Sequence, residues 1–301
     1  MGITRVGNLA LHQSTLKDVA NVQSRLGTLQ EQISSGNKAK DFSGLSGQVE
    51  QFTLLEAKMR TSQQFIDTNN VNIARMKTAD NAMAAMVDIA DSMENLMVQA
   101  RGAVSEGLNF EQNMKNLLGN LGTQMNVNFE GRYLLGGTNT AQQPVPDPYY
   151  IPLADGVPDN GYYRGSSNNL TYRQDERLNY EMPVRADDPA FQKIIAAANQ
   201  AINAFKNGDD ASMQAAVSLM QEGQQHLSSA RGKLNNTIVN VENTNEQLTS
   251  LKLYLKGVTE EVSKTDLVAA STEVANNQAI LQAAFQVFAS LSQLRLSDFL
   301  R

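Results

Sequence analysis

Proline is confined to one short stretch of this sequence, and that confinement limits the possible folds more than any other feature. All seven prolines lie between residues 144 and 189, and residues 1–143 and 190–301 have none. A proline inside a helix costs about 3 kcal/mol, because it removes a hydrogen bond and clashes with the preceding turn. Both flanks can therefore form long uninterrupted helices, with a turn-rich insert between them.

The N-terminal flank has apolar residues at helical spacing. Near the chain start these residues alternate by three and four positions, the pattern of a coiled-coil seam, and Gly36 is expected to end this helix. A second run begins near Gln48 and predicts a helix of roughly sixty residues, about 90 Å long, ending near Gly102 or Gly107. A shorter helix is expected over about 110–130.

The C-terminal flank carries local signals for helix starts and stops. Asp188 and Pro189 predict an N-cap followed by proline at the first helical position, and that helix should end near Gly208. Asp209 or Asp210 is then expected to cap another long helix. A last helix is expected after Asp266.

The insert has the composition of short strands and turns. Six of the eight tyrosines lie in it. Aromatic residues between turn residues predict strands over 132–137, 161–165, 170–173 and 178–184. The expected fold is therefore mainly α, a long helical bundle or coiled coil built from both chain ends, with a small inserted β domain.

The same features predict five parts along the chain. These are an N-terminal assembly helix and linker (1–44), the N-terminal half of a helical core (45–135), an inserted β-rich domain (136–187), the C-terminal half of the core (188–262) and a C-terminal assembly helix (263–301).

Composition argues against several classes of function. The net charge is −6, so phosphates are not attracted and nucleic acid is not an expected partner. There are no cysteines, and the two histidines, His12 and His226, are not at metal-ligand spacing. No signal-peptide h-region is expected, and the uncharged tract 274–294 holds eight polar residues, too many for insertion into a membrane.

Motifs for catalysis are missing from the sequence. It has no HExxH, no Walker A, no G-x-S-x-G and no dinucleotide fingerprint. Asp187 and Asp188 are adjacent carboxylates, which we interpret as part of a helix cap rather than an acid–base pair. The methionines between Met76 and Met97 have two interpretations, an adaptable binding groove or core filling, and core filling is favoured. We therefore expect no enzyme, no metal and no cofactor.

Both chain ends are amphipathic and sparsely charged. Residues 1–35 hold five charged residues and 266–301 hold five. A lone helix with a narrow apolar stripe is marginal in water, so each end needs a packing partner. We interpret the ends as segments that fold on assembly with other copies; the alternative is a helical hairpin closed within one subunit. The residues expected to carry subunit packing are Val19, Val22, Leu26, Leu29, Ile33, Leu281, Phe285, Phe288, Leu291 and Leu294.

Three segments resemble a known family. Residues 26–36, LGTLQEQISSG, resemble the start of bacterial flagellins and their hook-associated relatives, and 281–300 resembles their C-terminal helix. Residues 131–138, GRYLLGGT, and Tyr162-Tyr163-Arg164-Gly165 resemble the middle of hook-associated protein 3, the hook–filament junction protein family FlgL.

The resemblance implies a structural component of the bacterial flagellum that connects the hook-associated protein 1 layer to the flagellin filament. It implies, as partners, copies of itself, hook-associated protein 1, filament flagellin, and the flagellar type III export machinery with its chaperone. It also implies an extracellular location at the hook–filament junction, reached without a cleaved signal peptide. Two alternatives stay open: a short filament-forming flagellin, and a secreted helical protein that engages host membranes.

Overall fold

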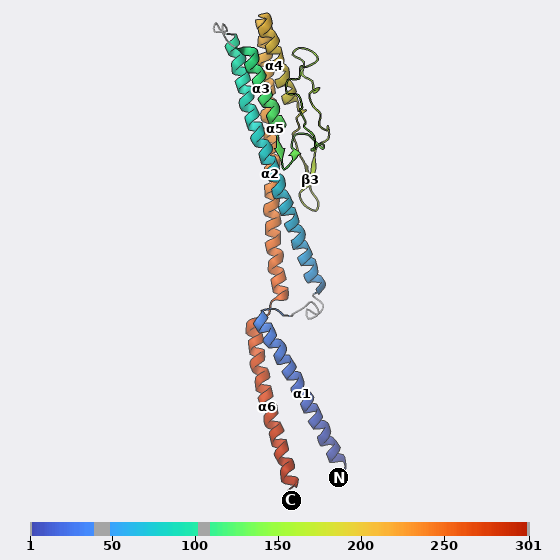
Figure 1. Ribbon diagram of the computed structural model, residues 1–301. Helices are drawn as coiled ribbons and strands as arrows, with labels where there is room; N and C mark the ends of the chain where they lie inside the picture. Colours follow the sequence, from blue (N-terminus) through green and yellow to red (C-terminus); the bar gives the residue numbers. More distant parts are fainter. Residues whose placement is uncertain (1, 39–48, 102–108, 300–301) are drawn as a thin grey trace. The chain divides into compact units, whose positions relative to one another are not determined.

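The computed structural model describes the backbone of residues 2–38, 49–101 and 109–299, and the side chains of 13–38, 49–101, 109–261 and 263–289. The fold is mainly α with a small β insertion, as predicted (Figure 1). The helices are α1 (Gly2–Ser35), α2 (Val49–Ala100), α3 (Phe110–Met125), α4 (Pro189–Asn207), α5 (Asp210–Ser263) and α6 (Leu267–Phe299). The strands are β1 (Asn128–Phe129), β2 (Arg132–Tyr133), β3 (Thr171–Arg173) and β4 (Asn179–Glu181).

The chain forms two compact units. One, the terminal unit, comprises residues 1–60 and 252–301; the other, the core unit, comprises residues 61–251. This division follows Cα packing and does not test the five-part division predicted from sequence, which stays a prediction. Its first boundary, at 44 and 45, and the helix ends predicted at Gly102 and Gly107 lie outside the described residues.

In the core unit, α2 and α5 run antiparallel along each other. Arg231 Nε donates to Asp80 Oδ1 at 2.7 Å, and Lys77 Nζ to Glu242 Oε1 at 2.7 Å. Arg101 Nε donates to Asp210 Oδ1 at 2.7 Å, a bond that raises the guanidinium pKa and lowers the carboxyl pKa. The residue numbers of the α5 partners decrease as those of the α2 partners increase, so the two helices are antiparallel.

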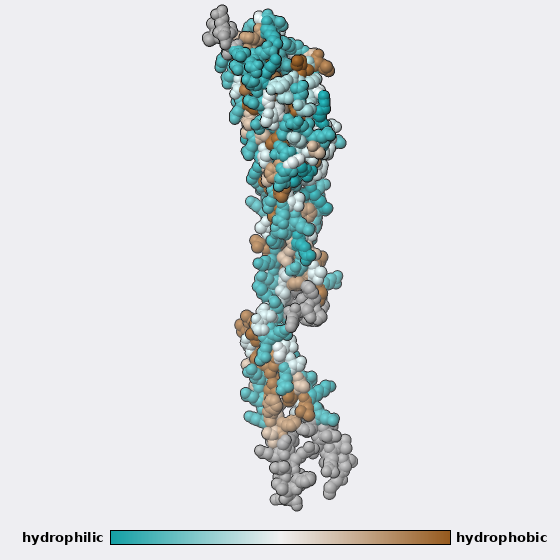
Figure 2. Space-filling view, viewed as in Figure 1, coloured by the Kyte–Doolittle hydropathy of each residue, from teal (hydrophilic) through white to brown (hydrophobic). Residues whose placement is uncertain are grey.

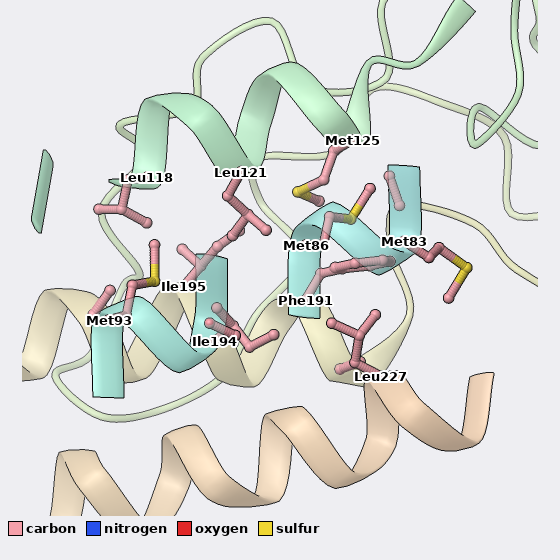
Figure 3. Close-up of a cluster of buried hydrophobic side chains, with 14 of the residues drawn as sticks. Met83, Met86, Met93, Leu118, Leu121, Met125, Phe191, Ile194, Ile195 and Leu227 are labelled. Atoms are coloured by element: carbon pink, nitrogen blue, oxygen red, sulfur yellow. The ribbon is translucent and has the colours of Figure 1, made fainter. Parts of the chain in front are cut away.

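The core of this unit is formed where α2, α3, α4 and α5 meet (Figure 3). Met76, Met83, Met86, Met93 and Met97 of α2 are buried in it, so core filling is the correct interpretation for them and the binding-groove alternative is wrong. A Cβ added at Gly223 of α5 would lie 2.7 Å from Ile194 Cγ1, so α4 and α5 approach closely there. The buried side chains labelled in Figure 3 are Met83, Met86, Met93, Leu118, Leu121, Met125, Phe191, Ile194, Ile195 and Leu227.

The helix-boundary signals of the C-terminal flank act as predicted. The Asp188 carboxylate accepts the Ala190 N–H at 2.9 Å, and Pro189 is the first residue of α4. Gly208 ends α4, and Asp209 accepts the Ser212 N–H at 3.0 Å to cap α5. These outcomes depend on a few adjacent residues, and the sequence therefore predicts them well.

Two local predictions in the middle of the chain are wrong. Residues 161–165 form a turn instead of a strand: the Tyr163 N–H donates to Asn160 O at 3.0 Å, and the Arg164 N–H reaches Pro144 O at 2.8 Å. The helix predicted over 110–130 ends at Met125, because the chain turns there into the β1–β2 hairpin, in which Phe129 pairs with Arg132.

Candidate assembly surface

The two terminal helices, α1 and α6, pack side by side as an antiparallel hairpin within the terminal unit (Figure 1). Gly36 ends α1 with φ 72°, as predicted, and its carbonyl accepts the Thr265 N–H at 3.0 Å. The Lys38 N–H donates to Ser263 O at 2.8 Å. This pairing joins the end of α1 to the start of α6, so the two chain ends pack on each other within one chain, as the hairpin alternative predicted.

Asp266 provides the N-cap of α6 at this joint. Its Oδ1 accepts the backbone N–H groups of Val268 and Ala269, each at 3.0 Å. One turn earlier, Lys264 Nζ lies 2.8 Å from Glu260 Oε2, and this hydrogen bond lowers the pKa of the Glu260 carboxyl. The break between α5 and α6 is therefore specified by a defined cap.

The α1–α6 seam is narrow and partly polar. Leu29, Ala270 and Asn277 are buried, and Arg25 forms an ion pair with Glu273 across the seam. The Asn277 side-chain amide donates to the Glu273 carbonyl at 2.9 Å, so this hydrogen bond lies within α6. Other packing residues predicted from sequence are half-buried: Val19, Val22, Leu26, Ile33, Leu281 and Phe288.

Large apolar side chains remain exposed on the same hairpin. Leu16, Ile280 and Phe285 are 50%, 52% and 55% exposed. Phe285 belongs to the predicted packing set, yet it does not lie in the seam. The side chains of Leu291 and Leu294, also in that set, lie outside the described residues. The sequence reasoning missed Ile280 and Leu16 because they fall beside the main stripe.

Incomplete burial defines what this surface can do. Burying a Leu, Ile or Phe side chain fully contributes roughly 1.5–3 kcal/mol. Helices of this kind gain most of their stability from packing, and here the packing within one chain covers only part of the apolar surface. A neighbouring helix pair that covered Ile280 and Phe285 would add the missing burial. The hairpin therefore leaves large apolar side chains uncovered, and it carries few charges.

The insert is organised around the Gly136-Gly137 turn. Gly137 has φ 63°, and a Cβ there would lie 2.3 Å from the Ser166 carbonyl oxygen. The Ser166 N–H donates to Gly136 O at 2.9 Å, and the Thr138 N–H to Asn168 O at 3.0 Å. Only glycine fits this backbone conformation at such close approach. The turn therefore holds two distant parts of the insert together.

Two polar side chains form hydrogen bonds that hold the insert, one within it and one from the residue that follows α3. The buried Tyr162 hydroxyl donates to Ala186 O at 2.8 Å, and burial raises its pKa. The Asn126 side chain, just past α3, donates to Val145 O at 2.6 Å and accepts the Val145 N–H at 2.9 Å. The sequence singled out Tyr162 through its resemblance but gave no signal for Asn126, whose partner is nineteen residues away.

No group of His, Asp or Glu among the described residues is placed to hold a metal ion. None of the described helices is long and apolar enough to cross a bilayer. His226 is exposed on α5 and lies 3.3 Å from Lys193 Nζ.

Comparison with known proteins finds a family match in the N-terminal part of the chain. Residues 6–140 match the bacterial flagellin N-terminal helical region. No protein with a curated description matches the chain. The family match covers the N-terminal part of the chain, which is similar to bacterial flagellins in that region.

Two solved structures share the fold. Bacillus cereus FlgL aligns with a TM-score of 0.55 at 16% identity, covering 70% of this chain and 99% of that protein. A protein from Vibrio parahaemolyticus, described as a flagellar hook-associated protein, aligns with a TM-score of 0.60 at 14% identity, covering 71% of this chain and 96% of its own. At these identities the likeness shows the fold.

Proposed function

We propose that this chain is a junction protein of the bacterial flagellum, which connects the hook-associated protein 1 layer to the flagellin filament. The observation that carries the proposal is the α1–α6 hairpin, whose apolar surface is only partly covered within one chain. Such a surface suits a subunit that packs into a tubular assembly through both chain ends. The predicted packing residues, including Leu291 and Leu294, would cover one another between copies.

The insert supports a junction protein over a filament subunit. Its Gly136-Gly137 turn and its buried Tyr162 build a fixed non-helical unit on α3 and α4. The fold it shares with FlgL and with a hook-associated protein favours the same choice. Copies of itself, hook-associated protein 1 and filament flagellin are the proposed partners, with export by the flagellar type III machinery and its chaperone, without a cleaved signal peptide.

Labelling of intact flagella tests the location. An epitope tag in the exposed stretch around Glu176 of the insert should mark a single band between hook and filament in electron micrographs. A strain that lacks the gene should secrete flagellin and grow no filament, and the tagged gene should restore it. Normal filaments in the deletion strain would contradict the proposal.

A short filament-forming flagellin is the second candidate. It is motivated by the matched flagellin N-terminal region, which both classes share. Under that reading the tag would decorate the whole filament length, and the purified chain would polymerise alone into long filaments. A junction protein should add to existing ends without growing into filaments by itself.

A further inference from the structure

A loop of the insert exposes large apolar side chains to solvent. Tyr149, Ile151 and Leu153 are 55%, 70% and 94% exposed. Figure 2 shows a brown, hydrophobic patch over the insert, at the upper right of the view. Single exposed apolar residues are common on protein surfaces, but a contiguous group marks an interaction site.

Polar contacts hold this loop in place. The Leu153 N–H donates to Asp159 Oδ2 at 2.9 Å, and the Asp155 Oδ1 accepts from the Asn203 side chain of α4 at 2.9 Å. Desolvation by burial raises the pKa of the Asp159 carboxyl. The hydrogen bonds from the Gly161 and Leu153 N–H groups lower it, and the net pKa lies below its ordinary value. The apolar side chains are therefore presented by a fixed support.

Close contact with α3 adds to that support. A Cβ at Gly122 would lie 2.3 Å from Pro148 Cβ, and one at Gly119 would lie 2.9 Å from the Tyr149 hydroxyl. Both glycines let the loop lie directly against the helix backbone. The loop thus covers one flank of α3.

The other flank of α3 carries a groove. It lies between α2 and α3 and has a volume of about 430 Å³. Leu96 and Leu117 supply its apolar part, and amide side chains border it, including those of Asn95, Gln99, Asn113 and Asn116. An apolar side chain fits this floor, and the amides can bond to the backbone beside it.

The loop and the groove lie on different flanks of α3. Asn113 lines the groove and Gly122 touches the loop. They are nine positions apart, which at 3.6 residues per turn places them about 180° apart around the helix. Figure 1 agrees, with α2 on one side of α3 and the insert on the other. A projection on one flank and a recess on the opposite flank make a heterologous contact, which closes into rings or propagates as helices.

We propose that the 149–153 loop of one copy docks in the α2–α3 groove of the next copy around the assembly. Leu153 enters the groove between Leu96 and Leu117, and Ile151 packs on the rim. The inference rests on the proposed function, because it takes the neighbour to be a second copy of this chain.

The size of the contact favours a second copy over a free partner. Three side chains of this size bury a few hundred Å², below the roughly 800 Å² per partner of a stable interface. Such a contact is too small to hold a dimer in solution. Between copies already aligned by their terminal helices, the contact forms within one assembly, where the effective concentration is high.

Cysteine cross-linking on intact flagella tests the contact, because the chain has no cysteines of its own. Leu153→Cys combined with Asn116→Cys should give a ladder of dimers, trimers and larger species on mild oxidation. Each single variant should stay monomeric. The matched control combines Leu178→Cys, 53% exposed elsewhere in the insert, with Asn116→Cys and should yield at least roughly tenfold less ladder. The free subunit should not cross-link.

A charge variant gives an independent readout. Leu153→Asp should leave the urea midpoint of the purified subunit unchanged and reduce its incorporation into flagella, whereas Leu178→Asp should incorporate normally. Equal ladders from the test and control pairs, or a subunit that sits at the junction without cross-linking, would overturn the loop–groove contact and leave the proposed function standing. Absence of the unsubstituted subunit from flagella would overturn both the contact and the proposed function.

Discussion

The core unit and the terminal unit are both built mainly from helices, yet they bury very different amounts of apolar surface. In residues 61–251 the buried side chains join into one continuous cluster from Ile73 to Val241. Among the described residues of the terminal unit, the buried hydrophobics are Leu29, Leu255 and Ala270. Helical periodicity is present in both units, but in the core unit it is matched by partners on several sides. The terminal helices have one partner each within the chain.

The largest difference should appear when one phenylalanine is removed from each unit. Phe191→Ala empties a fully buried site in the core unit and should cost about 3–5 kcal/mol of unfolding free energy. Phe285→Ala, at a side chain 55% exposed, should cost no more than about 0.5 kcal/mol in the free subunit. Urea unfolding of the purified subunit measures both.

Incorporation into flagella should be sensitive to Phe285→Ala, the variant that costs the free subunit less stability. Phe285→Ala should reduce incorporation into flagella although the subunit folds normally, since the side chain is proposed to face a neighbour. A large loss of stability in the free Phe285→Ala subunit would show that the terminal unit is already tightly packed, and the contrast between the two units would fail.

Within the core unit, the Gly136-Gly137 turn should be the next most sensitive point. Gly137→Ala adds a Cβ against a carbonyl at 2.3 Å in a backbone with φ 63°, and should cost roughly 2–4 kcal/mol. The control is Gly131→Ala, where φ is 79° but no atom lies within 4 Å of the added Cβ, so about 1–2 kcal/mol is expected. Thermal unfolding followed by near-ultraviolet circular dichroism compares them. Equal costs would contradict the close approach.

In the terminal unit, a substitution should stabilise instead. Asn277→Leu replaces a buried amide in the α1–α6 seam and should raise the stability of the hairpin by about 1 kcal/mol, because a polar seam residue costs stability. Asn276→Leu, at an exposed position on the same helix, is the matched control and should change little. Thermal unfolding of the α1–α6 hairpin, followed by far-ultraviolet circular dichroism, measures the effect of each variant. Loss of helicity in Asn277→Leu would mean that the amide is needed for pairing.

Alkaline pH should loosen the insert gradually. Burial raises the pKa of Tyr163 to about 12 from an ordinary value of 10.0. The folded state therefore favours the protonated phenol; this contribution to stability is complete below pH 10 and is lost as pH rises through 12. The chain has no tryptophan to interfere with tyrosinate absorbance. That absorbance should show a fraction of the tyrosines that titrates at high pH, and this fraction should disappear in urea. Tyr163→Phe should remove part of that fraction.

Local signals explain what the sequence predicted correctly. Gly36, Asp188 and Pro189 act on their immediate neighbours, and the structure places each as expected. The long proline-free helices and the insert were also predictable, because a proline is incompatible with a helix interior wherever it stands. The methionines of α2 were correctly assigned to the core by their helical spacing.

The seam of the hairpin was predictable only in part: Leu29 was predicted to pack, but the small and polar seam residues of α6 do not stand out as large apolar positions. Ala270, Asn277 and Ala284 recur every seven residues, and the first two are buried while Ala284 is half-buried. Contacts such as Asn126 with Val145 depend on chain geometry that no local pattern encodes.

Hydrogen exchange on the purified, dilute subunit tests the central claim most directly. The account predicts that backbone amides of 13–35 and 267–289 exchange orders of magnitude faster than those of α4 and the adjoining part of α5, and that they become protected once the subunit is incorporated into flagella. Equal, slow exchange of both regions in the free subunit would contradict it, because the terminal hairpin would then need no neighbour.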